Sequence, residues 1–506
     1  MRNKGKVYLI GAGPGDPGLI TLKAQRCLNI ADIIVYDYLV NTKLLENKKP
    51  NAEIIYVGKK SGHKELSQDK INKLLIKHAI DGKIVARLKG GDPFIFGRGA
   101  EEAIILSENN ISFEVIPGVS SFYAVPEYAG IPLTHRDISS TLAVITGHEN
   151  PQKSRSNIPW ASLSKISTLV FLMGITNLGE IVKKLIKNGK KPQTPAAIIT
   201  WGTYPEQITI TGTLDDIIKK SEENMISPPG ILIIGEVVKY REQIKWFEKK
   251  PLYGKKILIT RPTDQAKSFI DKLNDLGAQT IEFPTIEICP PSSWKKLDKS
   301  LKELSDTSWI IFTSTNGVKF FFKRFFEKKL NIKSLFNTKF AVIGEKTKES
   351  LNKFRLSADL IPKEYRAEGL IEQFNSIDLI GKKVLIPRAK EARGILAQKL
   401  ERLGANVEVI TVYENKKPDN LNSKKLISDI KKCNIDVITF TSPSTVSNFY
   451  SVFKPNEKSF KDCIIASIGP ITNQALNEHG VQADITPTKY TTDSLIEELL
   501  NHYNKN

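Results

Sequence analysis

Short apolar segments alternate with longer amphipathic segments along the first 248 residues. The apolar segments are typical of buried strands, whereas the longer ones repeat apolar residues at the spacing of a helix. The strands predicted are 7–10, 33–36, 54–57, 84–88, 142–146, 168–173, 196–200, 207–211 and 230–237. The helices predicted are 19–30, 67–80, 99–108 and one near 119–128. This alternation predicts an α/β fold with two lobes, residues 1–117 and 118–248, and a cleft between them.

The second half of the chain, residues 249–506, contains an internal repeat. The repeat follows a charged segment that includes Pro251, and we expect the domain boundary within that segment. The segment Gly254-Lys-Lys-Ile-Leu-Ile-Thr-Arg261 matches Gly381-Lys-Lys-Val-Leu-Ile-Pro-Arg388, and Phe-Thr-Ser occurs in both copies. Two such copies predict two similar doubly wound α/β lobes.

The chain has 506 residues and a formal net charge of +19, spread over both halves. A solvated lysine-rich surface is one interpretation of this charge, and attraction of small polyanions is another. A nucleic-acid binder is a third alternative, which salt-dependent binding would test. No apolar run approaches the ~20 residues of a membrane helix, and the apolar start is too short for a signal peptide, so we expect a cytoplasmic protein.

Cysteine and histidine spacing argues against a metal site. The 4 cysteines form no CxxC pair, and the 6 histidines stand singly along the chain. Ligand sets for metals normally show closer and more regular spacing.

Two glycine-rich segments follow predicted strands, where open α/β sheets bind their ligands. The first, residues 11–18, departs from the dinucleotide fingerprint because Asp16 stands at its third glycine. Pro14 also removes an amide donor that a pyrophosphate would need. The second, residues 88–102, places Gly90-Gly-Asp92 at a strand end, where a ligand can touch bare backbone. The segments therefore indicate a ligand without phosphates, a simple structural turn being the alternative.

The glycine segments belong to a longer set of motifs. The set comprises Gly11-Ala-Gly-Pro-Gly-Asp16, Ala31-Asp-Ile-Ile-Val-Tyr-Asp37, Val57-Gly-Lys59, Arg87-Leu-Lys-Gly-Gly-Asp-Pro-Phe-Ile-Phe-Gly-Arg-Gly99, Ile116-Pro-Gly-Val119 and Gly130-Ile-Pro-Leu-Thr-His-Arg136. In this order the motifs closely resemble uroporphyrinogen-III C-methyltransferases of the tetrapyrrole methylase family, over residues 5 to about 248. The resemblance implies a two-lobed fold with S-adenosylmethionine, the methyl donor, bound in the cleft.

The same resemblance implies roles for individual residues. Asp37 is the candidate base that takes a pyrrole proton, with helix capping as the alternative, and Lys59 is the candidate acid, with a surface lysine as the alternative. Expected contacts to the donor come from Pro14, Gly90, Gly91, Asp92, Ile95, Ser120, Ser121, Met173 and Gly202. The family commonly has Thr-Ala where this chain has Ser120-Ser121, so the hydroxyl at 120 is kept and position 121 departs from the family pattern. Candidates for pairing with substrate carboxylates are Arg87, Arg98 and Arg136.

A second set of motifs spans about 254–500. It comprises Thr260-Arg-Pro262, Thr313-Ser-Thr-Asn-Gly-Val318, Ile343-Gly344, Ile410-Thr-Val-Tyr413, Thr441-Ser-Pro-Ser444 and Ile468-Gly-Pro470. In this order the motifs resemble uroporphyrinogen-III synthases, in which each lobe is discontinuous in sequence. The resemblance implies one lobe of about 254–288 plus 414–506 and another of about 289–409. The connections would run through 280–288 and 407–413.

The second resemblance implies a ring closure. The linear tetrapyrrole hydroxymethylbilane would lose its hydroxyl, invert its last ring and cyclise without a metal or redox cofactor. Tyr413 is the candidate donor to the leaving hydroxyl, with packing between the lobes as the alternative. Candidates for substrate contact are Arg261, Thr313, Ser314, Thr441, Ser442 and Gly469, and helix capping is the alternative for the hydroxyl groups.

Together the resemblances imply a bifunctional enzyme of sirohaem and cobalamin precursor synthesis. It would close hydroxymethylbilane to uroporphyrinogen III and methylate it twice to precorrin-2, with neither nucleic acid nor membrane as a partner. A homodimer through the first half and the choice between sirohaem and cobalamin are left open. The alternatives are a methylase for another corrin precursor and a non-catalytic tetrapyrrole-binding protein, which a turnover assay separates.

Overall fold

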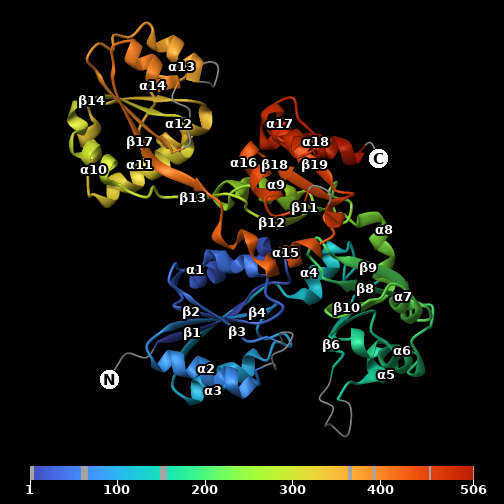
Figure 1. Ribbon diagram of the computed structural model, residues 1–506. Helices are drawn as coiled ribbons and strands as arrows, with labels where there is room; N and C mark the ends of the chain where they lie inside the picture. The colour runs from blue at the N-terminus through green and yellow to red at the C-terminus, as the bar shows by residue number, and fades with distance from the viewer. Residues whose placement is uncertain are drawn as a thin grey trace. The chain divides into compact units, whose positions relative to one another are not determined.

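The computed structural model describes residues 5–58, 66–148, 157–362, 367–390, 395–454 and 457–504 (Figure 1). The chain divides into two compact units. One consists of Met1–Lys255 with Leu273–Gln279, and the other of Lys256–Lys272 with Thr280–Asn506. Strands and helices alternate in both units, which confirms the predicted α/β class. No helix within the described ranges is both long and apolar enough to cross a membrane.

The first sheet of the first unit is parallel throughout, in the order β3-β2-β4-β1-β5. Its strands are β1 (Lys6–Gly11), β2 (Ile33–Tyr36), β3 (Glu53–Tyr56), β4 (Ile84–Lys89) and β5 (Ser112–Ile116). Its helices are α1 (Leu22–Ile30), α2 (Gln68–Ile80) and α3 (Gly99–Glu108). Figure 1 shows α1 on one face of the sheet and α2 and α3 on the other. The central strand β4 is therefore covered on both faces: Ala86 and Leu88 pack with α1, and Val85 packs with α2 and α3.

The helix expected from residue 19 begins three residues later. Thr21 caps α1, because its side chain accepts a hydrogen bond from the amide of Ala24 at 3.2 Å. The preceding residues Pro17–Leu19 form a separate short 3₁₀ turn, which Asp16 caps. The glycine-rich segment thus stays outside the helix and remains a loop.

The second sheet of the first unit is mixed, in the order β6-β7-β10-β8-β9. Only β6 and β7 run parallel, and the other neighbours are antiparallel. Its strands are β6 (Leu142–Thr146), β7 (Thr168–Leu172), β8 (Pro195–Thr200), β9 (Ile208–Thr213) and β10 (Gly230–Ile234). The associated helices are α4 (Ser121–Tyr128), α5 (Trp160–Leu163), α6 (Leu178–Lys187), α7 (Ile217–Glu223) and α8 (Arg241–Ile244). Separate apolar clusters cover its two faces, one with α5, α6 and α7 and one with α4.

The second unit contains two further sheets. The sheet β12-β11-β18-β19 is built from β11 (Lys256–Ile259), β12 (Gln279–Glu282), β18 (Val437–Phe440) and β19 (Ile464–Ser467). The helices in sequence around these strands are α9 (Thr263–Asp275), α15 (Lys424–Lys431), α16 (Pro443–Tyr450), α17 (Pro470–Glu478) and α18 (Thr492–Asn504). Strands from both ends of the unit's sequence therefore share one sheet.

The other sheet, β13-β17-β16-β14-β15, is contiguous in sequence. Its strands are β13 (Glu287–Cys289), β14 (Thr307–Phe312), β15 (Lys339–Val342), β16 (Lys383–Ala389) and β17 (Asn406–Lys416). Its helices are α10 (Lys295–Lys302), α11 (Thr315–Glu327), α12 (Glu345–Asn352), α13 (Ala367–Phe374) and α14 (Ile395–Arg402). The lobe limits predicted from the sequence, two lobes in each half of the chain, remain predictions.

The segment that follows residue 248 packs with the first unit. Leu252 is fully buried, and its amide donates to the carbonyl of Leu276 at 2.9 Å. The hydroxyl of Tyr253 donates to the carbonyl of Gln207. These contacts explain why the first unit extends to Lys255, a few residues beyond the boundary expected from the charged segment.

An ion pair between α10 and α11 gives the second unit a pH dependence. Nε and Nη2 of Arg324 donate to the two carboxylate oxygens of Asp298, each at 2.7 Å. These hydrogen bonds lower the pKa of Asp298 from 3.8 to about 2. Because the folded pKa is depressed, the stabilisation is complete above the unfolded value and is lost as the pH falls through about 2.

We expect Asp298→Asn to lower the free energy of unfolding of the second unit by about 1 kcal/mol at pH 7, since solvent screens a partly exposed pair. Near pH 2 the difference from the wild type should shrink towards zero. Calorimetric unfolding of the full chain at both pH values measures this. Asp271→Asn, at an exposed position of α9, is the matched control. An equal loss at both pH values would contradict the role of the carboxylate charge.

Candidate active sites

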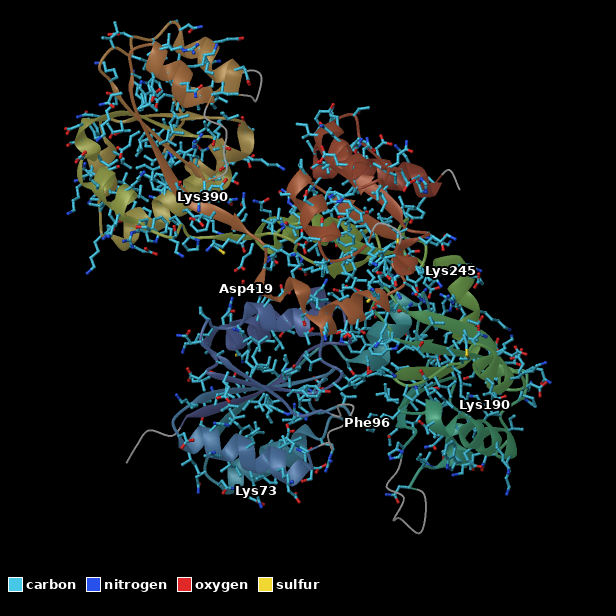
Figure 2. All side chains as sticks on the ribbon, in the orientation of Figure 1. Lys73, Phe96, Lys190, Lys245, Lys390 and Asp419 are labelled. Atoms are coloured by element: carbon cyan, nitrogen blue, oxygen red, sulfur yellow. The ribbon has the colours of Figure 1, made fainter. Side chains whose placement is uncertain are left out.

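The first unit contains a cavity of about 710 Å³. Its walls are the segments that follow β1, β2, β3, β4, β6, β7 and β8, residues of α2 and α4, and the start of β10. The predicted donor contacts that line it are Pro14, Gly90, Gly91, Ile95, Ser121, Met173 and Gly202. Phe96, which also lines it, is labelled in Figure 2 on the segment after β4. The structure thus brings together most of the residues singled out in both glycine-rich segments.

Two predicted donor contacts, Asp92 and Ser120, are not among the residues that line this cavity. The carboxylate of Asp92 accepts hydrogen bonds from the amide of Phe94 at 2.8 Å and from the amide of Gly118 at 3.0 Å. Asp92 therefore fixes loop backbone on two sides. Ser120 is buried at the N-terminus of α4. Lys59, the predicted acid, lies outside the described residues.

Backbone-to-backbone contact joins the loops after β1, β4 and β5 into a floor, which Gly13 and Gly91 present to the cavity. A Cβ on Gly118 would lie 2.3 Å from the carbonyl oxygen of Gly91 and 2.6 Å from Cα of Gly11. The loops after β1 and β4 also exchange hydrogen bonds, since Gly91 donates to Gly13 at 2.7 Å and Gly13 donates to Gly91 at 3.2 Å. Gly13 and Gly91 both have positive φ, +82° and +66°. The floor thus requires glycine both for space and for backbone conformation.

A charged cluster lies beside this floor. Arg87 donates from Nη2 to Asp37 at 3.3 Å and from Nε to Glu102 at 3.2 Å. Lys89 donates to the same oxygen of Glu102 at 2.9 Å. Burial, together with the neighbouring charge of Arg87, lowers the pKa of Lys89. Asp37, Arg87 and Lys89 all line the cavity, so the cluster reaches the space where a ligand would bind.

The three arginines predicted to pair with substrate carboxylates differ in their surroundings. Arg87 is buried against internal acids. Arg98 lines the cavity, and its guanidinium donates to the carboxylate of Glu101 at 2.9 and 2.8 Å. Arg136 is exposed and is not among the lining residues of this cavity. Arg98 is therefore the arginine best placed to exchange its partner for a ligand.

Several non-glycine residues around the cavity have a left-handed backbone. Their φ angles are 52° for Phe96, 56° for Arg98, 57° for Met173, 50° for Trp201 and 70° for Thr203. Each such conformation costs about 1 kcal/mol or more, and such residues cluster where surrounding structure holds a functional geometry. The loops from both sheets are therefore held in shape around the cavity.

The loop after β1 is tied to the second sheet through Asp16. Its amide donates to Oγ1 of Thr203 at 2.9 Å, and its carboxylate accepts from the hydroxyl of Tyr128 at 2.7 Å. Burial and this hydrogen bond raise the pKa of Tyr128, so the hydroxyl stays a donor. The residue that departs from the dinucleotide fingerprint thus fixes the loop whose Gly13 and Pro14 line the cavity.

Sequence reasoning missed several cavity residues. Tyr38, Trp201 and Tyr204 form an aromatic wall, with ring centroids 6.2 Å apart for the first pair and 5.7 Å for the second. Lys89 and Glu102 were not singled out either. The sequence did contain a signal for them, since two cations two residues apart interrupt the apolar pattern of β4. Such charges on a buried strand require an acid partner.

In the second unit, predicted residues meet at the start of α11. Ser314 caps the helix by accepting from the amide of Gly317 at 3.1 Å, and its hydroxyl lies 3.1 Å from the hydroxyl of Tyr413. Tyr413 is 7% exposed and stacks on Phe320 with ring centroids 5.8 Å apart. Its ring belongs to the apolar core of one sheet and its helices. Helix capping by Ser314 is therefore a real contact, whereas Tyr413 packs within the core of one sheet and its helices, not between the lobes as the alternative had it.

The second copy of the repeat is arranged differently. Ser442 and Thr445 form a reciprocal capping box at the start of α16. Thr441 precedes this cap, and Gly469 is the N-cap residue of α17. Arg261 follows β11, donates to Gln265 at 3.3 Å, and has a buried Nε with no hydrogen-bond partner among the described residues. Burial lowers the pKa of Arg261.

Two family models match the chain. The model of tetrapyrrole (corrin/porphyrin) methylases matches residues 6–218. The model of uroporphyrinogen-III synthase HemD matches residues 267–497.

Individual relatives extend these matches. The porphyrin biosynthesis protein HemD of Ruminiclostridium josui is 38% identical over 98% of this chain and 98% of its own length. The S-adenosyl-L-methionine-dependent uroporphyrinogen III methyltransferase of Methanosarcina barkeri is 48% identical over 47% of this chain and 93% of its own length. A crystal structure of uroporphyrin-III C-methyl transferase from Thermus thermophilus complexed with S-adenyl homocysteine shares 37% identity at a TM-score of 0.41, covering 46% of this chain and 99% of that one.

We expect Gly118→Ala to destabilise the first unit by about 1–3 kcal/mol, because the new methyl group would force the backbones of two neighbouring loops apart. Thermal unfolding of the full chain measures the loss. Gly179→Ala is the matched control, since nothing lies within 4 Å of a Cβ at that position of α6. It should leave stability unchanged or raise it slightly. Equal behaviour of the two variants would show that the loop contact is unimportant.

Proposed function

The chain belongs to the tetrapyrrole methylase family over its first half and to the uroporphyrinogen-III synthase family over its second, and we propose that its two units catalyse consecutive steps. It is a bifunctional enzyme of tetrapyrrole biosynthesis. The second unit closes hydroxymethylbilane to uroporphyrinogen III. The first unit methylates that product twice, with S-adenosylmethionine as donor, to give precorrin-2.

The cavity of the first unit is the observation that carries this proposal. A Cβ on Gly90 would lie 2.7 Å from Cβ of Leu39, and one on Gly202 would lie 2.2 Å from Cγ1 of Val125. Glycine at both positions therefore lets Leu39 and Val125, which also line the cavity, pack directly against backbone. The aromatic wall beside them offers flat apolar surface to a base or a pyrrole ring. When bound, S-adenosylmethionine supplies an electrophilic methyl group.

Asp37 is placed to act as the base of methylation. One carboxylate oxygen accepts from Arg87, whereas the other is buried with no hydrogen-bond partner among the described residues. The carboxylate of Asp37, which lines the cavity, can take the proton of a pyrrole nitrogen, which makes the ring carbon a better nucleophile. Arg98, at the cavity wall, can pair with a substrate carboxylate. The loops hold these groups in one geometry, which favours in-line attack.

We expect Asp37→Asn to slow methylation by at least about 100-fold while leaving ring closure unchanged, because the amide cannot accept the proton. The full chain is supplied with hydroxymethylbilane and S-adenosylmethionine, and uroporphyrinogen III and its dimethylated product are measured separately. Asp215→Asn, an exposed position before α7, is the control. Loss of both activities would refute the division of labour, and wild-type protein that consumes no donor would refute the methylation itself.

The second unit has hydroxyl groups suited to a ring closure by loss of water. The carbon–oxygen bond of the hydroxymethyl group breaks as the leaving hydroxyl takes a proton, and the α-carbon of the last ring that already carries a bridge attacks the resulting cation. The bond from that carbon to its old bridge then breaks, and the bridge carbon, now a cation, is attacked by the other α-carbon of the same ring. That second carbon loses a proton, so the ring is inverted and the net change is release of one water. Tyr413, whose hydroxyl lies beside Ser314, is our candidate proton donor. Thr313, Thr441, Ser442, Gly469 and Arg261 remain candidates for contact with substrate.

We expect Tyr413→Phe to slow ring closure by about 10- to 100-fold without affecting methylation of supplied uroporphyrinogen III, because only a hydroxyl donor is removed. Stopped-flow measurement of hydroxymethylbilane consumption tests this. Tyr450→Phe, at the end of α16, removes a hydroxyl from a half-buried tyrosine and is the control. An unchanged rate in Tyr413→Phe would remove this residue from the chemistry.

A further inference from the structure

The central strand of the first sheet carries two buried cations. Arg87 and Lys89 are two residues apart on β4, so both side chains point to the face covered by α2 and α3. They are only 3% and 4% exposed. Two like charges removed from water at this spacing are unfavourable unless an acid compensates them.

Glu102 is that acid. It lies in the first turn of α3, is 1% exposed, and one oxygen accepts from Arg87, Lys89 and Gln68 at 3.2, 2.9 and 3.0 Å. The positive end of the helix dipole also favours a carboxylate in this turn. Its other oxygen is buried and has no hydrogen-bond partner among the described residues. Glu102 is thus held at the centre of the cluster by three donors.

The guanidinium of Arg87 connects Glu102 to the cavity. Nε contacts Glu102, Nη1 donates to the carbonyl of Leu88 at 3.2 Å, and Nη2 contacts Asp37. These three contacts use three different nitrogens of one planar group, so the place of the last nitrogen follows from the other two. The orientation of Asp37 therefore depends on a carboxylate that does not itself line the cavity.

Compensation of buried charge alone would also explain why Glu102 is there. In that case its loss would destabilise the unit and would add to the effect of any change at Asp37. A role in orienting Asp37 makes a different prediction, because removing Glu102 would then have no further effect once Asp37 has lost its function.

We propose that Glu102 is a positioning residue for methyl transfer, acting on Asp37 through Arg87. The proposal rests on the function proposed above for Asp37. Glu102 touches neither donor nor substrate, so its loss should lower the rate of the chemical step and leave donor binding unchanged.

The test is a double-mutant cycle on the full chain with Glu102→Gln, Asp37→Asn and the double variant. Uroporphyrinogen III methylation is followed for kcat and for the KM of S-adenosylmethionine, and binding of S-adenosylhomocysteine is measured by calorimetry. We expect Glu102→Gln to lower kcat by about tenfold or more with binding within about twofold, and the double variant to match Asp37→Asn. Glu108→Gln, exposed at the end of α3, is the matched control and should behave as wild type.

Independent, multiplying losses in the double variant, or an unchanged kcat in Glu102→Gln, would overturn the proposal. If Glu102→Gln does not fold, Lys89→Gln/Glu102→Gln removes one charge of each sign and enters the same cycle in its place. If Asp37→Asn methylates normally, the proposed base is wrong. If Asp37→Asn is impaired but Glu102→Gln is not, only the positioning role falls.

Discussion

The first unit depends on a contact in which no side chain takes part. Gly11, Gly91 and Gly118 bring the ends of β1, β4 and β5 together, and a Cβ on the last of them would lie 2.3 Å from a backbone oxygen. Because the floor of the cavity is backbone, the loops after β4 and β8 can surround a ligand instead of filling the space. Asp92 secures this floor, although its sequence position next to two glycines indicated a contact to the ligand.

The buried charges of β4 set a second constraint on the first unit. Two cations on a central strand are tolerated only because Glu102 reaches them from the first turn of α3. The same arrangement leaves one nitrogen of Arg87 for Asp37 at the cavity wall. Structural compensation and placement of the proposed base thus share one guanidinium, whose several coplanar nitrogens a lysine lacks.

The two copies in the second unit share a pattern but differ in chemistry. At α11 the cap residue Ser314 meets the hydroxyl of Tyr413, whereas at α16 the cap residue Ser442 is satisfied by Thr445. A repeat therefore specifies the same helix start twice, while neighbours from β17 give only one of them a phenolic hydroxyl. The difference offers a physical reason to assign proton donation to the first of these helix starts.

The sequence by itself determined the α/β class, most strands of the first unit and the glycine-rich floor, because periodicity and glycine placement are local properties of the chain. Most of the donor contacts that it indicated also line the cavity. Only the tertiary structure decided that Asp92 bonds backbone, that Arg87 faces internal acids and that Arg136 lies away from the cavity wall. Hydrogen-bond partners such as Glu102 and Arg87 come from different elements of the fold. A local sequence pattern therefore cannot predict which acid pairs with which cation, or which carboxylate oxygen has no hydrogen-bond donor.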